Sequence, residues 1–254
     1  MIIREQEENF LMIRQHDHAI ISEQMTMKLK KGFLPDDDWQ RSVLYAIKMH
    51  DFGWSSFDAE PLWNDEKQIP YSFIDYPDQI KTILYKHGID EVAKEDPYAG
   101  LLCSKHYANF LAHDPSPEAT RFVINEENRQ KSIQEEFRVD HELVASHFEL
   151  LQFADNLSLF LCLNEPGAGQ EEFHYFFKKG IPFPKHVEEQ FGERLHLEWI
   201  DKHTIGSEKS PFQETFTVSI PFKKVSKAEI AKKGIRKSYN EAVEEIFSVY
   251  VKGD

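Results

Sequence analysis

The sequence predicts a mainly α fold, in which a bundle of helices is accompanied by a small antiparallel β-sheet. Apolar residues recur at helical spacing through most of the first 165 residues. Two short apolar runs, at 1–5 and 10–14, flank a polar turn and indicate a hairpin. Beyond Gly167 the residues alternate between β-branched or aromatic and polar types, which predicts strands. We expect these strands to join the hairpin in one sheet.

The individual elements follow from this periodicity and from the residues that start or stop helices. Helical spacing predicts helices over 18–30, 38–51, 78–88, 96–115, most of 116–167, and 227–251. Alternation predicts strands over 195–201 and 214–225. The segment 55–80 has three prolines, many aromatic residues and no steady period, so we expect a long ordered loop there.

Length and composition indicate one domain over 1–254, with a helical core at about 10–165 and an α+β extension at about 168–254. Its formal charge of −14 disfavours a general nucleic-acid binder. No apolar run approaches the roughly 18 to 20 residues of a membrane span, and the first residues are too acidic and interrupted for a secretory signal. We therefore expect a soluble, cytoplasmic protein with no membrane partner, either monomeric or a homo-oligomer.

Histidine and aspartate side chains on the apolar faces of these helices are the main functional signal. His18, His50 and Asp155 each lie on such a face, and Asp51 adjoins His50. Burying an unpaired carboxylate costs several kcal/mol, and a divalent cation bound by the cluster would offset that cost. Any one of these residues has an ordinary explanation as a buried polar group, a helix cap or an ion-pair partner. Together they predict a metal site.

The order of these residues resembles the HD-domain superfamily of metal-dependent phosphohydrolases. His18 comes first, the pair His50-Asp51 follows the helix SVLYAIKM, and Asp155 lies within LLQFADNLSLF. The resemblance spans about 10–165 and implies an HD-type helical bundle in which those four residues hold one metal ion. It implies hydrolysis of a phosphate ester or phosphodiester, such as a nucleotide or another small phosphate-containing substrate. The residues after the His-Asp pair are Phe52, Gly53 and the bulky Trp54, and Trp54 departs from the family pattern.

Further residues extend what this resemblance implies. His87 and His106 fall between the His-Asp pair and Asp155, as in members that hold two ions, so the cofactor would be one or two divalent ions of manganese, zinc, iron or magnesium. His106 is otherwise a polar substrate contact, and His87 a helix-terminal histidine. Asp51, His106 and Lys105 are the candidate catalytic residues, with Lys105 facing either the substrate phosphate or water.

Two other functions stay open at this stage. HD-type di-iron oxygenases use a similar order of ligands, and a metal-binding or sensory module would hold the ion without turnover. The aromatic residues of 55–80 would roof the pocket or pack in the core. Cys103 and Cys162 lie in apolar surroundings with no C-x-x-C pair, so we expect neither a disulfide nor a thiolate metal site.

Overall fold

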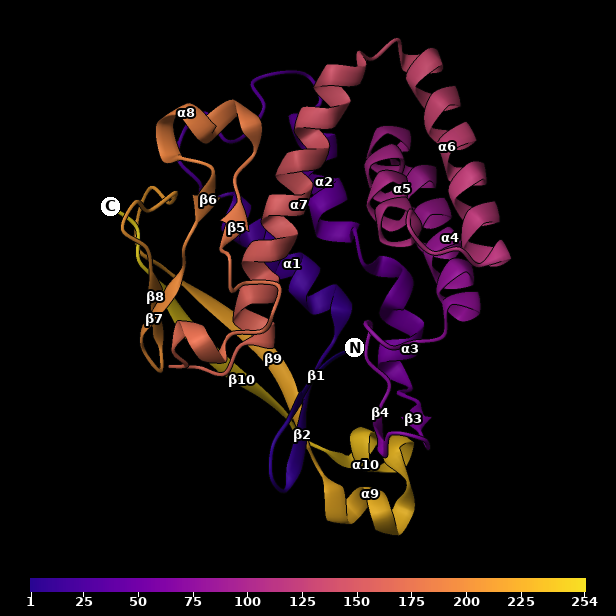
Figure 1. Cartoon of the computed structure of the whole chain (residues 1–254), viewed down its shortest axis with the longest axis vertical. Helices are drawn as coiled ribbons and strands as arrows, with labels where there is room; N and C mark the ends of the chain where they lie inside the picture. Colours follow the sequence, from indigo (N-terminus) through magenta and orange to yellow (C-terminus); the bar gives the residue numbers. More distant parts are fainter.

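The computed structural model describes residues 1–254 and contains a six-stranded mixed β-sheet beside a group of helices (Figure 1). In spatial order the strands are β1 (Ile2–Glu5), β2 (Asn9–Ile13), β9 (Phe216–Ser226), β10 (Glu244–Val251), β8 (Thr204–Gly206) and β7 (Glu198–Asp201). Neighbouring strands are antiparallel except β10 and β8, which are parallel. The N-terminal hairpin therefore shares one sheet with strands from the last quarter of the chain.

The expected fold class, a mainly α HD-type bundle with a small antiparallel sheet, is wrong. The chain is 52% helix and 18% strand, and its six-stranded sheet is curled and mixed. Part of the error is the helix expected over 227–251, which stops early. It is divided into α9 (Lys227–Lys233) and α10 (Ile235–Glu241), and β10 follows. In β10, Val249 and Val251 are buried while the residues between and before them are exposed, which is the two-residue period of a strand.

Six long helices make up most of the remaining structure. They are α1 (Gln15–Thr26), α2 (Gln40–Met49), α4 (Asp78–Glu95), α5 (Pro97–Leu111), α6 (Pro117–Phe137) and α7 (His141–Leu163). Asp96, Ser116 and Asp140 each accept a backbone N–H in the first turn of the helix that follows, which fixes where α5, α6 and α7 begin. None of these helices combines the length and apolarity that crossing a membrane requires.

Short elements connect the long ones. They are η1 (Phe52–Trp54), α3 (Ser55–Ala59), β3 (Trp63–Asn64), β4 (Ile69–Pro70), η2 (Gln170–Glu172), β5 (Ile181–Pro182), η3 (Lys185–Val187), α8 (Glu188–Phe191) and β6 (Arg194–Leu195). The segment 55–80, expected to be a loop, thus contains a short helix and a small hairpin. Tyr76 from this segment is buried and packs edge-on against Trp54, with ring centroids 5.6 Å apart.

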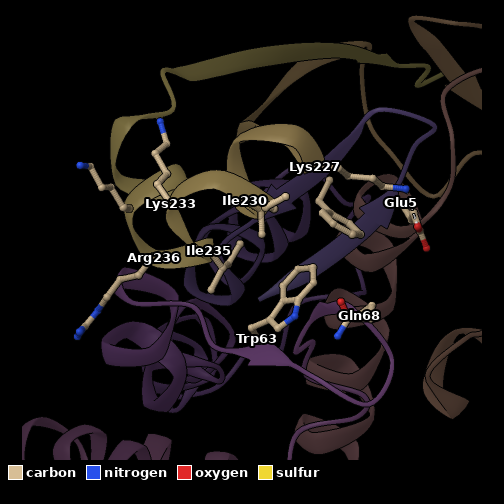
Figure 2. A pocket seen from close by; sticks show the side chains of 12 residues that line it. Glu5, Trp63, Gln68, Lys227, Ile230, Lys233, Ile235 and Arg236 are labelled. Atoms are coloured by element: carbon tan, nitrogen blue, oxygen red, sulfur yellow. Dashed lines mark hydrogen bonds and ion pairs between the residues drawn. The ribbon is translucent and has the colours of Figure 1, made fainter.

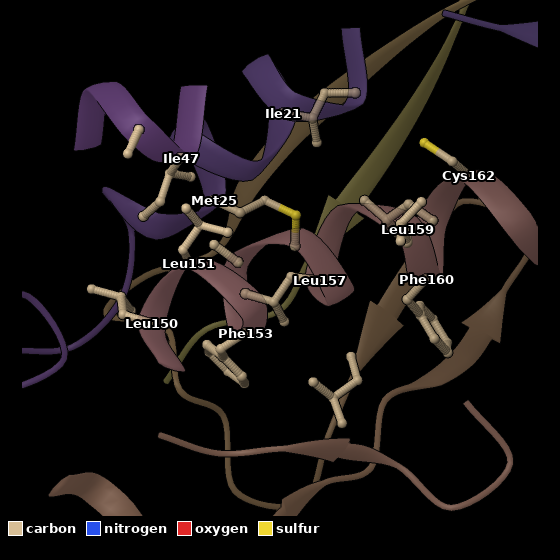
Figure 3. Packing of buried hydrophobic residues seen from close by; sticks show 14 of the residues in the cluster. Ile21, Met25, Ile47, Leu150, Leu151, Phe153, Leu157, Leu159, Phe160 and Cys162 are labelled. Carbon is tan, nitrogen blue, oxygen red and sulfur yellow. The ribbon is translucent and has the colours of Figure 1, made fainter. Parts of the chain in front are cut away.

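The core is built around α7, which is apolar on almost every side. Ile21 and Met25 of α1 and Ile47 of α2 lie on one side of this helix, while Phe153 and Phe160 point to the other (Figure 3). All of them belong to one cluster of 51 buried residues. A largely apolar helix is buried inside the protein, and its inward faces carry the polar side chains of His147, Asp155 and Ser158 into the interior as well.

Candidate metal centre

Five of the six side chains expected to bind metal lie together in the interior. His18 comes from α1, His50 ends α2, Asp51 follows it, His106 comes from α5 and Asp155 from α7, and all five are buried. They form two overlapping groups that share His50, and within each group the nearest nitrogen and oxygen atoms lie within 4.8 Å of one another. Residues from four separate helices or helix ends thus meet at one point.

The distances within this cluster match those between ligands of a single cation. His50 Nε2 lies 3.4 Å from Asp155 Oδ1 and 3.9 Å from Asp51 Oδ2. His106 Nε2 lies 4.0 Å from Asp155 Oδ2, whereas the 2.8 Å between His18 Nε2 and Asp51 Oδ2 is a hydrogen bond. Atoms that each bind a metal at about 2.1 Å are themselves separated by about 3 to 4 Å. One ion therefore fits among these atoms.

Neighbouring groups hold the candidate ligands in place. His50 Nδ1 hydrogen-bonds the carbonyl oxygen of Ile47 at 2.7 Å, which turns its Nε2 towards the carboxylates. His18 Nδ1 lies 2.8 Å from Ser158 Oγ, and Gln15 Nε2 donates to Asp51 Oδ2 at 2.8 Å. Such outer hydrogen bonds fix ring orientation and tautomer at metal sites.

Several atoms of the cluster are buried without a hydrogen-bond partner. They are His50 Nε2, His106 Nε2 and Asp51 Oδ1. Buried polar atoms are nearly always paired, so three unpaired atoms within one cluster require an explanation. Imidazole nitrogen and carboxylate oxygen together suit zinc, manganese or iron, and the residues present fit such an ion.

Charge interactions in the cluster shift several pKa values. Burial opposes ionisation of Asp51, but the hydrogen bond from His18 and the charge of His50 hold its pKa well below the usual range. Burial likewise disfavours charged His50, yet the nearby carboxylates of Asp155 and Asp51 raise its pKa to about 9. Burial lowers the pKa of His106 to about 4. In the metal-free protein at pH 7, His50 therefore carries the proton that balances the carboxylates.

A direct backbone contact positions the loop that follows the His-Asp pair. Gly53 of η1 lies against Gly88 of α4, and a Cβ on Gly88 would approach Gly53 N to 2.7 Å. A Cβ on Gly53 would approach the carbonyl oxygen of Leu84 to 2.5 Å. The expected helix end at Gly88 is therefore wrong. This glycine is an internal contact position, and α4 continues to Glu95.

A cavity of about 500 Å³ opens onto the cluster. Asp51, His106 and Asp155 line one part of it. Four carboxamide side chains also line it, those of Gln15, Asn109, Gln152 and Asn156. A molecule in this cavity has access to the candidate metal ligands and to many neutral hydrogen-bonding groups.

Two residues singled out in the sequence lie outside the site. The His87 side chain is 54% exposed and its nearest charged partner is Glu91, at 4.0 Å. Lys105 does not line the cavity, and its Nζ lies 5.5 Å from the ring centroid of Phe148. His87 is therefore not a ligand of this cluster, because its side chain is exposed. Lys105 is not a substrate contact in this cavity, because it adjoins His106 on the helix and neighbouring helix positions face different directions.

Three further polar residues do not line this cavity. Asp17 lies inside α1, and its carboxylate pairs with Arg14 at 2.6 Å. His16 packs edge-on against Phe52 and does not line the cavity. In the acidic run 36–38, Asp37 Oδ2 lies 3.2 Å from His147 Nε2.

Sequence reasoning missed four residues at the site. Gln15 and Ser158 lie three positions from His18 and Asp155 on the same helices, so helical spacing was a usable signal for both. Lys81 and Arg194 line the cavity from α4 and β6. No local pattern marks Arg194, because only the tertiary fold brings β6 to the helices.

A larger cavity of about 720 Å³ lies elsewhere, between α9, α10 and the strands β1 to β4 (Figure 2). Trp63 and the isoleucines Ile230 and Ile235 line its apolar part. At its edge Lys227 pairs with Glu5 at 2.7 Å. None of its residues belongs to a group that could hold a metal ion, so it is not the candidate centre.

Comparison with known families gives one match. A family model described as "Protein of unknown function (DUF3891)" matches residues 1–227. Searches of curated proteins and of solved structures found no match. The expected membership of the HD-domain superfamily is therefore wrong, since the matching family is a different one and the curled mixed sheet is no part of an HD-type bundle.

Proposed function

We propose that this chain, which belongs to the DUF3891 family, is a metal-dependent hydrolase of a phosphate ester or phosphodiester. The observation that carries the proposal is the buried cluster of three histidines and two aspartates, three of whose polar atoms have no hydrogen-bond partner and three of whose residues line a cavity. The proposal rests on these side chains alone and not on kinship with any enzyme family.

A purely structural role for the cluster is a poorer explanation. Two carboxylates and three imidazoles in the interior cost several kcal/mol in desolvation unless each atom is paired. Here His106 Nε2 and Asp51 Oδ1 have no partner. The two groups of ligands share His50, and His87 does not reach the cluster to hold a second ion, which favours a single divalent ion of zinc, manganese or iron.

The bound ion and the residues around it have separate roles in the proposed reaction. A bound divalent ion supplies Lewis-acid chemistry, which makes water more acidic and stabilises charge on phosphoryl oxygens. Gln15 and His18 both hydrogen-bond Asp51 Oδ2, which leaves Asp51 Oδ1 without a partner. His106 is neutral at pH 7 because of its lowered pKa. In the hydrolysis, water oxygen bonds to phosphorus as the bond from phosphorus to the leaving oxygen breaks.

Elemental analysis followed by a substrate screen tests this function. We expect about one zinc, manganese or iron per chain, and phosphate release that is lost in His50→Ala and Asp155→Ala. His87→Ala is the matched control and should keep both metal and activity, because its side chain lies outside the cluster.

Other results would contradict hydrolysis. Bound iron with oxygen uptake and no phosphate release would indicate an oxidative enzyme. Metal whose loss in His50→Ala lowers only the melting temperature, with no turnover of any phosphate ester, would indicate a binding module. A wild-type protein that neither contains nor takes up a divalent metal would end the proposal.

A further inference from the structure

The cavity beside the centre contains two cationic side chains that differ in their surroundings. Lys81 Nζ lies 3.2 Å from Asp78 Oδ1 and donates to the carbonyl oxygen of Ile74 at 3.2 Å, so its charge is already balanced. Arg194, by contrast, forms no ion pair with any carboxylate of the chain. Arg194 is therefore the free positive charge of this cavity.

Two backbone carbonyl groups hold the Arg194 guanidinium. Its Nε donates to Lys179 O at 2.7 Å and its Nη2 to Gly180 O at 3.2 Å. Gly180 has a φ of +77°, and a Cβ there would approach Leu195 O to 2.8 Å, so glycine permits this close approach of β5 and β6. The guanidinium is oriented before a ligand arrives, and Nη1 keeps both N–H groups available.

The charge of the cavity favours an anion. Its lining includes two cationic side chains, Lys81 and Arg194, and two carboxylates, Asp51 and Asp155. Because Asp78 already balances Lys81, a divalent ion among the two carboxylates would leave one net positive charge, that of Arg194. A phosphate anion complements that charge better than a neutral or cationic molecule does.

The mouth of the cavity is apolar and aromatic. Phe110 of α5 and Phe176, which precedes β5, both line it and are 49% and 38% exposed. Large apolar side chains exposed beside a polar cavity are typical of a ligand-binding rim. They offer surfaces for a flat ring attached to the anion.

Resting on the proposed function, we infer that Arg194 binds the phosphate of the substrate and that the substrate is a phosphate ester with an aromatic group, which packs on Phe110 and Phe176. The segment after Gly167 thereby supplies a wall and an anion-binding residue to the helical centre. A nucleobase and a simple aryl ring share this chemistry.

Equilibrium binding tests the role of Arg194 without turnover. Inorganic phosphate is titrated by calorimetry into manganese-loaded protein. We expect Arg194→Gln to weaken phosphate binding about tenfold or more, with Arg194→Lys intermediate because lysine lacks the planar fork. Arg121→Gln is the matched control, since Arg121 is exposed on α6, has no ion pair and lies outside the cavity. Manganese content and melting temperature should stay unchanged in all three.

Two arms test the aromatic group. Phenyl phosphate should bind about tenfold more tightly than methyl phosphate, and Phe110→Ala with Phe176→Ala should remove that advantage without weakening inorganic phosphate. Tighter binding of a nucleoside monophosphate than of phenyl phosphate would identify a nucleobase as the ring, and the reverse would identify an aryl group.

Different experimental results would contradict this inference and the proposed function. Unaltered phosphate binding in Arg194→Gln, or equal binding of phenyl and methyl phosphate, overturns the inference even if the wild type is a phosphatase. Binding that depends on Arg194 and on the aromatic rim, with no hydrolysis of any ester, would confirm the binding site and contradict only the proposed hydrolase function.

Discussion

Asp51 is the residue at which the interactions of the centre meet. One of its carboxylate oxygens, Oδ2, lies 2.8 Å from both His18 Nε2 and Gln15 Nε2, while Oδ1 has no partner. The carboxylate is thus fixed by one oxygen and open at the other. The apolar faces of the helices were enough to predict His18, His50 and Asp155, with Asp51 beside His50, whereas His106 came only from the order of residues and the direction of Lys105 was not predictable.

Ser158 should control metal affinity through His18. Its hydroxyl lies 2.8 Å from His18 Nδ1 and 2.7 Å from Ser22 Oγ. We expect Ser158→Ala to weaken metal binding about tenfold, the lower end of the range for such outer hydrogen bonds. Ser238→Ala, another buried helical serine but far from the centre, should not change it. Equal affinities in competition with a chelating dye would contradict the role given to Ser158.

Metal binding should release a proton from His50. Folding raises the pKa of His50 from 6.5 to about 9, so its stabilising effect is complete below pH 6.5 and is lost as the pH rises to about 9. The pKa values of Asp51 and Asp155 are lowered, so their contribution is lost in acid, below the ordinary value of 3.8.

The measurement is calorimetric titration of metal in buffers with different ionisation enthalpies. We expect release of about one proton at pH 7 and an affinity that increases from pH 7 to 9. Proton release should disappear in His50→Gln. An affinity that does not change over this pH range would mean that His50 is already neutral in the metal-free protein.

At the scale of elements, the contact between η1 and α4 sets where the His-Asp pair points. The sequence marked Gly88 as a helix end, because glycine commonly follows the last turn of a helix. In the structure it is buried within α4 and touches Gly53. A single sequence cannot distinguish a glycine needed for its backbone angles from one needed for its lack of a side chain.

Gly88→Ala should therefore destabilise the protein and disturb the centre. The new Cβ would meet backbone atoms of Gly53 at 2.7 and 2.8 Å, which cannot move aside as a flexible side chain would. We expect a loss of about 1 to 3 kcal/mol in urea unfolding and weaker metal binding. Gly169→Ala, where the nearest atom is a carboxylate oxygen 3.8 Å away, should be neutral. Full stability in Gly88→Ala would show that the two elements separate easily.

At the scale of the whole molecule, the sheet connects segments that are distant in the sequence. β9 lies between β2 and β10, and its partner pairs include Phe10 with Val225 and Val249 with Val218. The helices were predictable because their periodicity is local. The order and direction of the strands were not, since the parallel pairing of β10 with β8 depends on contacts between residues about 46 positions apart, such as Tyr250 and Thr204.

Val249 tests whether β10 belongs to the common core. Its side chain is fully buried, whereas Val243, just before the strand, is 77% exposed. Val249→Ala should lower the free energy of unfolding by about 2 kcal/mol from two lost methylene equivalents, and Val243→Ala should have almost no effect. Unfolding should remain one transition when followed by both helical and aromatic signals. Two separate transitions would show that the sheet and the helices unfold independently.

The packing of α1 on β9 has a consequence for the time at which the centre is completed. α1 carries His18, and it contacts β9, whose two neighbours are the N-terminal hairpin and the strand that ends at Val251. On the ribosome, His18 emerges long before residues 216–226, so α1 lacks its contact with β9 until that strand has been synthesised. A nascent chain stalled before residue 216 would hold all five ligands but lack the sheet that supports the helix of His18, and we expect it to bind the cation more weakly than the complete chain.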